Sequence, residues 1–247
     1  MNILILINKD SNINKLKTIL VSGAVVAMSF SSIANSIELR AGLTANTSAY
    51  YANVTETLKD SGHKESTEAL AAFSYASGFA EVSLESLMGI TFGVSYVPDA
   101  ISLTTADREI QTTLYASKGT PTGQDTQGGI QQVQADVTDL VTAYLAVPIM
   151  ETGLSVKIGI MQGSLETKET LATGSTYKDE DLDGTTVGMF YDGNLGDMAF
   201  YRVEAAYIEF EDINATGSEV GGTASSYNKI NAELGGVKAA LSVGVRF

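Results

Sequence analysis

Residues 237–247 of this chain read VKAALSVGVRF, and the odd-numbered and even-numbered positions differ in character. The odd-numbered residues are apolar or aromatic and end at Phe247, whereas the even-numbered residues include Lys238 and Arg246. Strict alternation of this kind predicts a β-strand with one apolar and one polar face. Because a soluble β-sandwich and a membrane barrel both use such strands, the rest of the sequence has to decide between them.

The composition narrows the class of protein. The 247 residues carry 29 acidic and 15 basic side chains, a net charge of −14, and no Cys. A disulfide-stapled module and a Cys-ligated zinc protein are excluded, and nucleic-acid binding is disfavoured because phosphate contacts need basic groups. After residue 36 no apolar run reaches the roughly 18 residues that a transmembrane helix requires. Any membrane-spanning part of the mature chain must therefore be β.

Residues 1–34 have the pattern of a secretory signal peptide. Three Lys residues precede an apolar run at 18–30, and Ser32 and Ala34 are small residues at the positions that signal peptidase recognises. The run is too short to span a bilayer as a helix, which takes about 20 residues. We expect cleavage after Ala34 and export of residues 35–247.

The mature chain can be divided into eight alternating strands, at 37–45, 72–84, 86–97, 133–147, 154–161, 185–192, 199–207 and 237–247. The connections alternate between short turns and long loops, the long ones near 46–71, 98–132, 169–184 and 212–226. Up-and-down membrane barrels require this alternation, whereas a β-sandwich does not. The predicted fold class is all-β, an antiparallel up-and-down transmembrane β-barrel of eight strands that makes up the whole of residues 35–247.

Three features leave alternatives open. Residues 63–71 have helical propensity, and 101–116 can be drawn as an extra hairpin, which would give ten strands. In the fourth strand, Leu140 and Tyr144 compete for the lipid-facing side with residues of the opposite parity, namely Val141, Ala143 and Leu145.

The faces assigned to the barrel interior carry eight charged residues: Arg40, Glu38, Glu81, Lys157, Arg202, Glu204, Lys238 and Arg246. The lumen of an eight-stranded barrel is just wide enough for side chains to fill. Opposite charges must pair there, because an isolated buried ion costs several kcal/mol. We expect a structural ion network, with an ion-selecting constriction as the alternative. Small inward residues such as Gly93 leave room either for water or for bulky neighbours such as Arg202.

Aromatic residues fall near the predicted strand ends, where rings form interfacial girdles in membrane barrels. They are Tyr96, Tyr144, Tyr191, Tyr201, Tyr207 and Phe247.

One acidic motif has the spacing of a calcium loop. Asp179, Asp181 and Asp183 alternate and are followed by Gly184, which matches D-x-D-x-D-G. The twelfth position is Phe190 where an EF-hand needs a bidentate Glu. We interpret the segment as a solvated outer loop, with a Ca²⁺ or Mg²⁺ site shared with lipopolysaccharide phosphates as the alternative. No other cofactor is expected.

His63 is the one histidine of the chain and lies near Ser61 and Glu65. Nucleophilic catalysis needs a base oriented against a nucleophile, and no orienting carboxylate can be placed by pattern. We expect a protein that is not an enzyme.

A terminal aromatic residue that closes an alternating strand, as Phe247 does, resembles the last strand of Gram-negative outer-membrane β-barrels. With the signal peptide and the hairpin rhythm, the chain resembles the small OmpA-like and OmpW-like superfamily of barrels. This resemblance implies that Phe247 is an assembly signal for the barrel-assembly machinery and that the protein contacts outer-membrane lipid and lipopolysaccharide. An OmpA-type protein would continue into a peptidoglycan-binding domain, whereas this sequence ends with the barrel.

The functional expectation is an envelope-structural and surface-presentation role in the outer membrane, with acidic loops facing outward. A narrow porin for small solutes or ions is the principal alternative. A lipid A-modifying enzyme at the barrel rim and a soluble secreted β-sandwich are further alternatives.

Overall fold

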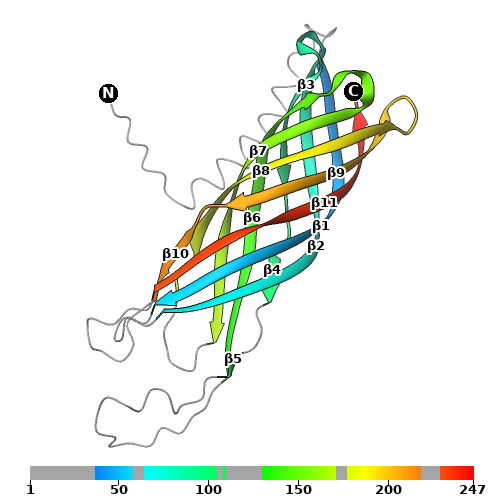
Figure 1. The fold of residues 1–247 in the computed structure, drawn as a ribbon. Helices are drawn as coiled ribbons and strands as arrows, with labels where there is room; N and C mark the ends of the chain where they lie inside the picture. Colours follow the sequence, from blue (N-terminus) through cyan, green and yellow to red (C-terminus); the bar gives the residue numbers. More distant parts are fainter. Residues whose placement is uncertain (1–36, 58–63, 105–107, 110–129, 171–176, 218–228) are drawn as a thin grey trace, which may run out of the picture.

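Eight antiparallel strands close into a barrel in the computed structural model of the chain (Figure 1). The structure describes residues 37–57, 64–104, 108–109, 130–170, 177–217 and 229–247. In order round the wall the strands are β1 (Ile37–Thr57), β2 (Lys64–Leu84), β3 (Ile90–Tyr96), β6 (Ile130–Pro148), β7 (Leu154–Thr170), β8 (Glu180–Asn194), β9 (Ala199–Phe210) and β11 (Lys229–Arg246). The predicted all-β, eight-stranded antiparallel barrel is confirmed. The signal-peptide assignment at 1–34 lies outside the described residues.

Pairing between the first and last strands closes the wall. β1 and β11 are in register from Arg40 opposite Arg246 to Thr57 opposite Lys229. Phe247 continues this ladder, because its N–H donates to the Leu39 carbonyl at 2.9 Å and its carbonyl accepts from Leu39 N–H at 3.2 Å. The terminal residue is therefore part of the seam that turns a sheet into a ring.

Three short strands lengthen the wall without adding a position to it. β4 (Ile101–Thr104) and β5 (Arg108–Glu109) pair with β6 beyond the end of β3, and β10 (Ile213–Thr216) pairs with β11 beyond the end of β9. The two strands within 101–116 both pair with β6, so they do not form the extra hairpin of the ten-strand alternative. The described strands make eight positions.

Several strands reach well into the segments expected to be loops. Residues 50–57 pair with residues 64–71 as a continuation of β1 and β2 away from the C-terminus. The helical interpretation of 63–71 is wrong over 64–71, because ladder hydrogen bonds to β1 override local propensity. Likewise β6 begins at Ile130 and β8 at Glu180. The predicted strands are shorter than the observed ones because the outward side chains near the far ends of the strands are polar. The alternation of apolar and polar residues stops there, although the backbone pairing continues.

A β-bulge in β6 settles which face of this strand looks inward. The register with β7 shifts between Thr138 and Val141, and Asp139 has a φ of 51°. The extra residue rotates the strand so that Leu140 and Tyr144 are buried in the interior. Val141, Ala143 and Leu145 consequently lie on the outer face. The expectation that Tyr144 belongs to an interfacial girdle is wrong for this reason.

Three tight connections lie at one end of the barrel, which we call the turn end. They contain the short helices η2 (Glu85–Leu87) and η4 (Met150–Thr152), and residues 195–198 between β8 and β9. The C-terminus lies at this end as well, and the longer strands extend toward the opposite end, here called the far end (Figure 1). No helix in the described part of the chain is long and apolar enough to cross a membrane.

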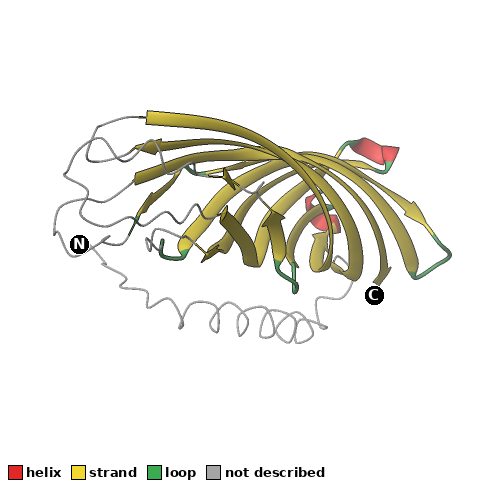
Figure 2. Ribbon diagram, turned by 90° about the horizontal axis from the view of Figure 1, so that it is seen from below, coloured by secondary structure: helices red, strands yellow, loops and turns green. Residues whose placement is uncertain are grey.

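The strands form a wall that curves round a common interior (Figure 2). Their side chains alternate between the two sides of this wall. In β9, for example, every second residue is buried from Phe200 to Phe210. Large apolar side chains point outward and are exposed, including Leu43, Phe92, Ile158, Ile160, Val187, Val203, Leu241 and Val243. Unlike a soluble barrel, the molecule therefore has many large apolar side chains on its outer surface.

We predict that Gly42→Ala weakens the closing seam. A Cβ at Gly42 would lie less than 3 Å from the Phe79 ring and from the Val243 carbonyl oxygen. Overpacking of this kind costs about 1–3 kcal/mol in free energy of unfolding. The matched control is Gly78→Ala on the neighbouring strand, where a Cβ meets no atom closer than 3.9 Å. Urea unfolding in detergent should separate the two variants, and equal stability would contradict the tight seam.

Candidate functional site

Arg202 occupies the centre of the barrel interior near the turn end. It comes from β9, and its guanidinium binds carboxylates from two other strands, Glu81 on β2 and Asp192 on β8. The Nε atom donates to Asp192 Oδ1 at 2.7 Å, while one terminal nitrogen donates to Asp192 Oδ2 at 2.9 Å and to Glu81 Oε2 at 3.0 Å. The side chains of Arg202 and Glu81 are 3% and 0% exposed. Paired charges replace the water that these ions have lost.

Aromatic rings surround this guanidinium. Its central carbon lies 3.7 Å from the ring centroid of Phe190, and Phe79 and Phe200 have centroids at 5.4 and 5.6 Å. Cation–π contacts strengthen when the cation is desolvated. The rings therefore favour the charged arginine in a space where it has little water.

The Tyr144 ring lies over Gly93 of the neighbouring strand β3, because a glycine there leaves room for it. A Cβ at Gly93 would collide with the Tyr144 ring, which lies flat against the glycine. The Tyr144 hydroxyl then donates to Glu81 Oε1 at 2.7 Å. The sequence left open whether small inward residues accommodate water or bulky neighbours, and at Gly93 the answer is a bulky neighbour.

A second ion cluster adjoins the first. Glu204 accepts from Lys157 and forms an ion pair with Lys238 at 2.7 Å. The Lys157 Nζ atom also lies 4.7 Å from the centroid of the Tyr144 ring. Tyr144 thus links the two clusters, since its ring contacts Lys157 and its hydroxyl binds Glu81.

Arg40 and Arg246 complete the ion network at the mouth of the turn end. They face each other directly across β1 and β11, where like charges repel. Acceptors from other positions offset this repulsion: Arg40 binds Glu38 and donates to Asp192 at 2.9 Å, and Arg246 donates to Asn194 at 2.8 Å. Asp192 is shared between Arg40 and Arg202 and so connects the mouth to the centre.

We call this network of interior charges, together with Tyr144, the ion layer. It contains Asp192 and all eight charged residues that the sequence placed in the interior: Glu38, Arg40, Glu81, Lys157, Arg202, Glu204, Lys238 and Arg246. Sequence analysis missed Asp192 and the inward position of Tyr144. The parity of β8 could have revealed Asp192, because it follows the inward Phe190 by two residues. The inward position of Tyr144 depends on the bulge at Asp139, for which the sequence carries no comparable signal.

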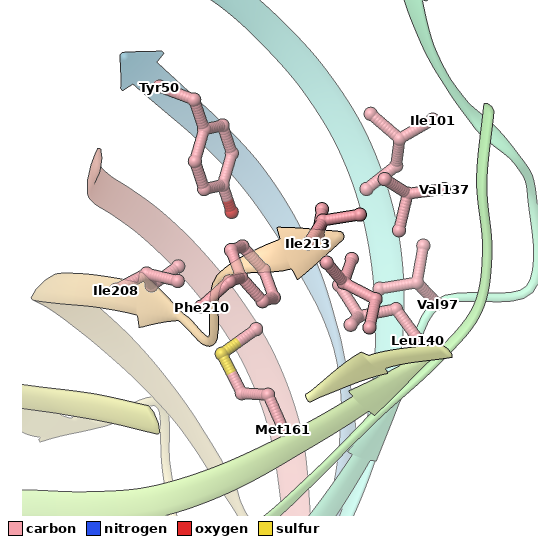
Figure 3. Close-up of a cluster of buried hydrophobic side chains, with 10 residues drawn as sticks. Tyr50, Val97, Ile101, Val137, Leu140, Met161, Ile208, Phe210 and Ile213 are labelled. Atoms are coloured by element: carbon pink, nitrogen blue, oxygen red, sulfur yellow. The ribbon is translucent and has the colours of Figure 1, made fainter. Parts of the chain in front are cut away.

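A second layer, made of apolar side chains, fills the interior above the ion layer toward the far end. Figure 3 shows these side chains pointing toward one another from strands around the wall. We call them the apolar layer: Tyr50, Val97, Ile101, Val137, Leu140, Met161, Leu182, Ile208, Phe210 and Ile213. Leu182 and Ile208 are 0% exposed. Two kinds of side chain therefore fill the interior at different levels: charged side chains near the turn end and apolar side chains toward the far end.

Tyrosines mark two levels on the outer surface. Toward the far end, the Tyr51 and Tyr207 hydroxyls lie 3.2 Å apart, and the Tyr96 hydroxyl donates to Asp139 at 3.0 Å. Near the turn end, the rings of Tyr191 and Tyr201 lie 6.2 Å apart. Exposed apolar side chains of the strands, such as Met189, Val203 and Leu241, lie between these levels, as expected for aromatic girdles that flank an apolar belt.

The acidic motif does not form the turn that its spacing predicted. Asp181 and Asp183 lie on the exposed outer face of β8, and Asp183 accepts from Gln162 at 3.1 Å. Asp179 accepts instead from the Thr167 N–H at 3.4 Å. Side chains on an extended strand cannot wrap a cation as a calcium loop does. Within the described residues no group of three His, Cys, Asp or Glu side chains could hold a metal ion.

The residues considered for catalysis lie outside the part of the chain that the structure describes. Ser61 and His63 fall in the gap between β1 and β2.

Comparison with known proteins places the fold. The structure is similar to that of the outer membrane protein OprG from Pseudomonas aeruginosa, with a TM-score of 0.58 and 8% sequence identity, over 86% of this chain and 96% of OprG. The fold is that of a small outer-membrane β-barrel. Weaker similarity extends to the outer membrane protein AlkL (TM-score 0.42, 13% identity, 83% of this chain and 90% of AlkL). It extends also to the outer membrane protease OmpT from Escherichia coli (TM-score 0.47, 12% identity, 86% and 97%).

Sequence comparison adds no closer relationship. No family model matches the chain, and no curated protein matches it. The fold is therefore established by structure alone.

We predict that Arg202→Ala is among the most destabilising single changes in the barrel. It leaves Glu81 and Asp192 without their central cation, and an uncompensated buried charge costs about 3–5 kcal/mol. The matched control is Arg246→Ala at the mouth, where the side chain is 22% exposed and the loss should be about 1 kcal/mol or less. Chemical unfolding of both variants in the same detergent measures the difference. Similar losses would show that the centre of the ion layer is no more important than its edge.

Proposed function

We propose that this protein is an integral outer-membrane barrel with an envelope-structural and surface-presentation role, and that its lumen is closed to water and ions. The observation that carries the proposal is the ion layer. Its charges are held by partners on β1, β2, β7, β8, β9 and β11, so the layer ties opposite sides of the wall together. A network of this kind stabilises a barrel and leaves no open aqueous path through its level.

The outer surface supports the membrane location. Hydrocarbon offers backbone amides no hydrogen-bond partner, so a sheet can span it only as a closed ring. The β1–β11 seam provides that closure, and the exposed apolar belt between two levels of tyrosines matches the surface of membrane barrels. The turn end would then face the periplasm, and the far end would project from the cell.

The proposal includes the partners that the resemblance implied. Outer-membrane lipid would contact the belt, and lipopolysaccharide would surround the far end. Phe247 would be recognised during assembly, and it is suited to this because its side chain is 71% exposed while its backbone completes the seam. Export through the signal peptide, the absence of enzymatic activity and the absence of a cofactor belong to the same proposal.

A narrow porin would require a wet lumen. Selective pores conduct through water-filled constrictions lined by charge. Here Arg202, Glu81 and Lys157 are side chains with 5% exposure or less, and the apolar layer follows directly above them. The geometry favours a closed barrel over this alternative.

We expect no stable ion conductance from the purified protein in planar bilayers. Its closed-barrel state should first be verified by a heat-dependent shift on semi-native gels of the outer-membrane fraction. Arg202→Ala serves as the comparison, because it removes the central cation of the ion layer. Stable wild-type conductance with an ion preference that changes in Arg202→Ala would overturn the closed-lumen proposal and support the porin. Recovery in the soluble periplasmic fraction without a heat shift would overturn the membrane proposal.

The apolar layer favours a second candidate function, reversible binding of small apolar molecules from the far end. Polar side chains line water-filled barrels, whereas this part of the interior is hydrocarbon. Apolar protein interiors can accept molecules such as benzene when space is available. In this interpretation an apolar molecule would enter by displacing side chains of the apolar layer, and the ion layer would be the floor of the site.

Methionine methyl NMR tests this second function. Met161 belongs to the apolar layer and is 5% exposed, while Met88 and Met150 are 84% and 90% exposed at the turn end. With benzene added to the protein in micelles, we expect a saturable shift of the Met161 methyl signal. Met88 and Met150 report the general effect of benzene on the micelle. Equal, non-saturating shifts at all three positions would show that benzene enters the detergent and not the lumen.

A further inference from the structure

Each of the three connections at the turn end exposes a pair of large apolar side chains. Met88 and Met150 are 84% and 90% exposed, and the whole set is Leu87, Met88, Ile149, Met150, Leu195 and Met198. Tight turns in water normally carry polar residues and glycine. Exposed apolar groups that recur in this way mark an interaction surface.

The backbone at Met88 and Met150 has a conformation that is unusual for residues other than glycine. Met88 and Met150 have φ values of 58° and 48°, in the left-handed region that glycine and asparagine occupy at least cost. Among the described residues the only other non-glycine with positive φ is Asp139, at the bulge. A strained position that holds a long apolar side chain indicates that the side chain itself is needed there.

On β3 and β7, the strands that follow η2 and η4, the outward apolar stretch is shorter than the apolar part of a membrane. On β7 the outward apolar side chains run from Leu154 to Ile160 and end at Gln162. At a rise of about 3.3 Å per residue and a tilt of about 40°, this stretch covers about 15 Å along the barrel axis. On β3 the stretch from Ile90 to Tyr96 covers the same height. The apolar band of outer-membrane barrels is about 25 Å tall.

The missing height lies on the side of the turns. At the far end the belt is bounded by polar groups beside the tyrosines, such as Asp139, Asp183 and Glu209 on the outer surface. On the turn-end side of the belt, the turn that contains η2 leads into Ile90, and the turn that contains η4 leads into Leu154. The exposed turn residues therefore continue the outward apolar surface of β3 and β7.

We propose that the three turns insert into the interfacial layer of the inner leaflet and anchor the barrel in lipid. This inference rests on the proposed membrane location. Two of the turns also carry a carboxylate, Glu85 in one and Asp197 in the other. Such a charge can reach the headgroups while its apolar neighbours enter the acyl region, which limits the depth of insertion to the interface. The occupant of this surface is therefore phospholipid and not a periplasmic protein.

The sequence makes a direct test available, because the chain contains no Trp. A single Trp can be placed at Met88 or Met150 and the protein reconstituted in phosphatidylcholine vesicles with acyl chains brominated at shallow or deep positions. Ile158→Trp, in the middle of the belt, is the lipid control. Asp212→Trp, at an exposed position of the far end, is the aqueous control.

We expect Met88→Trp and Met150→Trp to lose fluorescence to the shallow bromines and to emit at shorter wavelength than Asp212→Trp. Ile158→Trp should be quenched most by the deep bromines. If both turn variants behave like Asp212→Trp and respond only to aqueous acrylamide, while Ile158→Trp is quenched by lipid, the turns lie in water and this inference fails although the membrane proposal stands. If Ile158→Trp is also unquenched, the membrane proposal itself fails.

Discussion

The structure depends on closure of the β1–β11 ladder. An open sheet would leave one strand edge of N–H and C=O groups unpaired at each end, and no such edge is tolerated in hydrocarbon. Closure fixes the remaining choices, because a ring of eight strands has an interior of set width and an exterior that faces a different solvent. The seam runs from the Leu39–Phe247 pair to Thr57 opposite Lys229, so it continues beyond the level at which the tyrosines end the belt.

Closure creates the problem that the interior solves. Eight strands enclose too little room for bulk water and too much for backbone alone, so side chains must fill the space. The ion layer fills it with charges that satisfy one another, and the crowding is visible where Tyr144 lies over Gly93 and Arg202 lies against Phe190. Toward the far end, the apolar layer contains no charged side chain. The two layers fill the described interior in different ways, one with paired charges and the other with side chains that carry no charge.

The interior and exterior together favour a barrel that acts through its surfaces. A pore would hold its charged groups in contact with water, whereas Glu81 and Arg202 are almost completely buried. The exterior, in contrast, changes character along the axis, from apolar turns through an apolar belt to a polar far end. This asymmetry is the basis for the proposed lipid contact of the turns and the proposed exposure of the long strands to the medium.

Sequence alone predicted the architecture, because alternation and turn spacing are local signals of strands with two different faces. It also placed Arg40, Glu81, Lys157 and Arg202 inside, since the parity of a strand fixes the side on which each residue lies. Only the tertiary structure decided which charges pair, because partners such as Arg202 and Glu81 come from strands far apart in the chain. It also decided the inward position of Tyr144, which depends on one bulge, and the true length of the strands, which backbone pairing extends beyond the reach of any hydrophobic pattern.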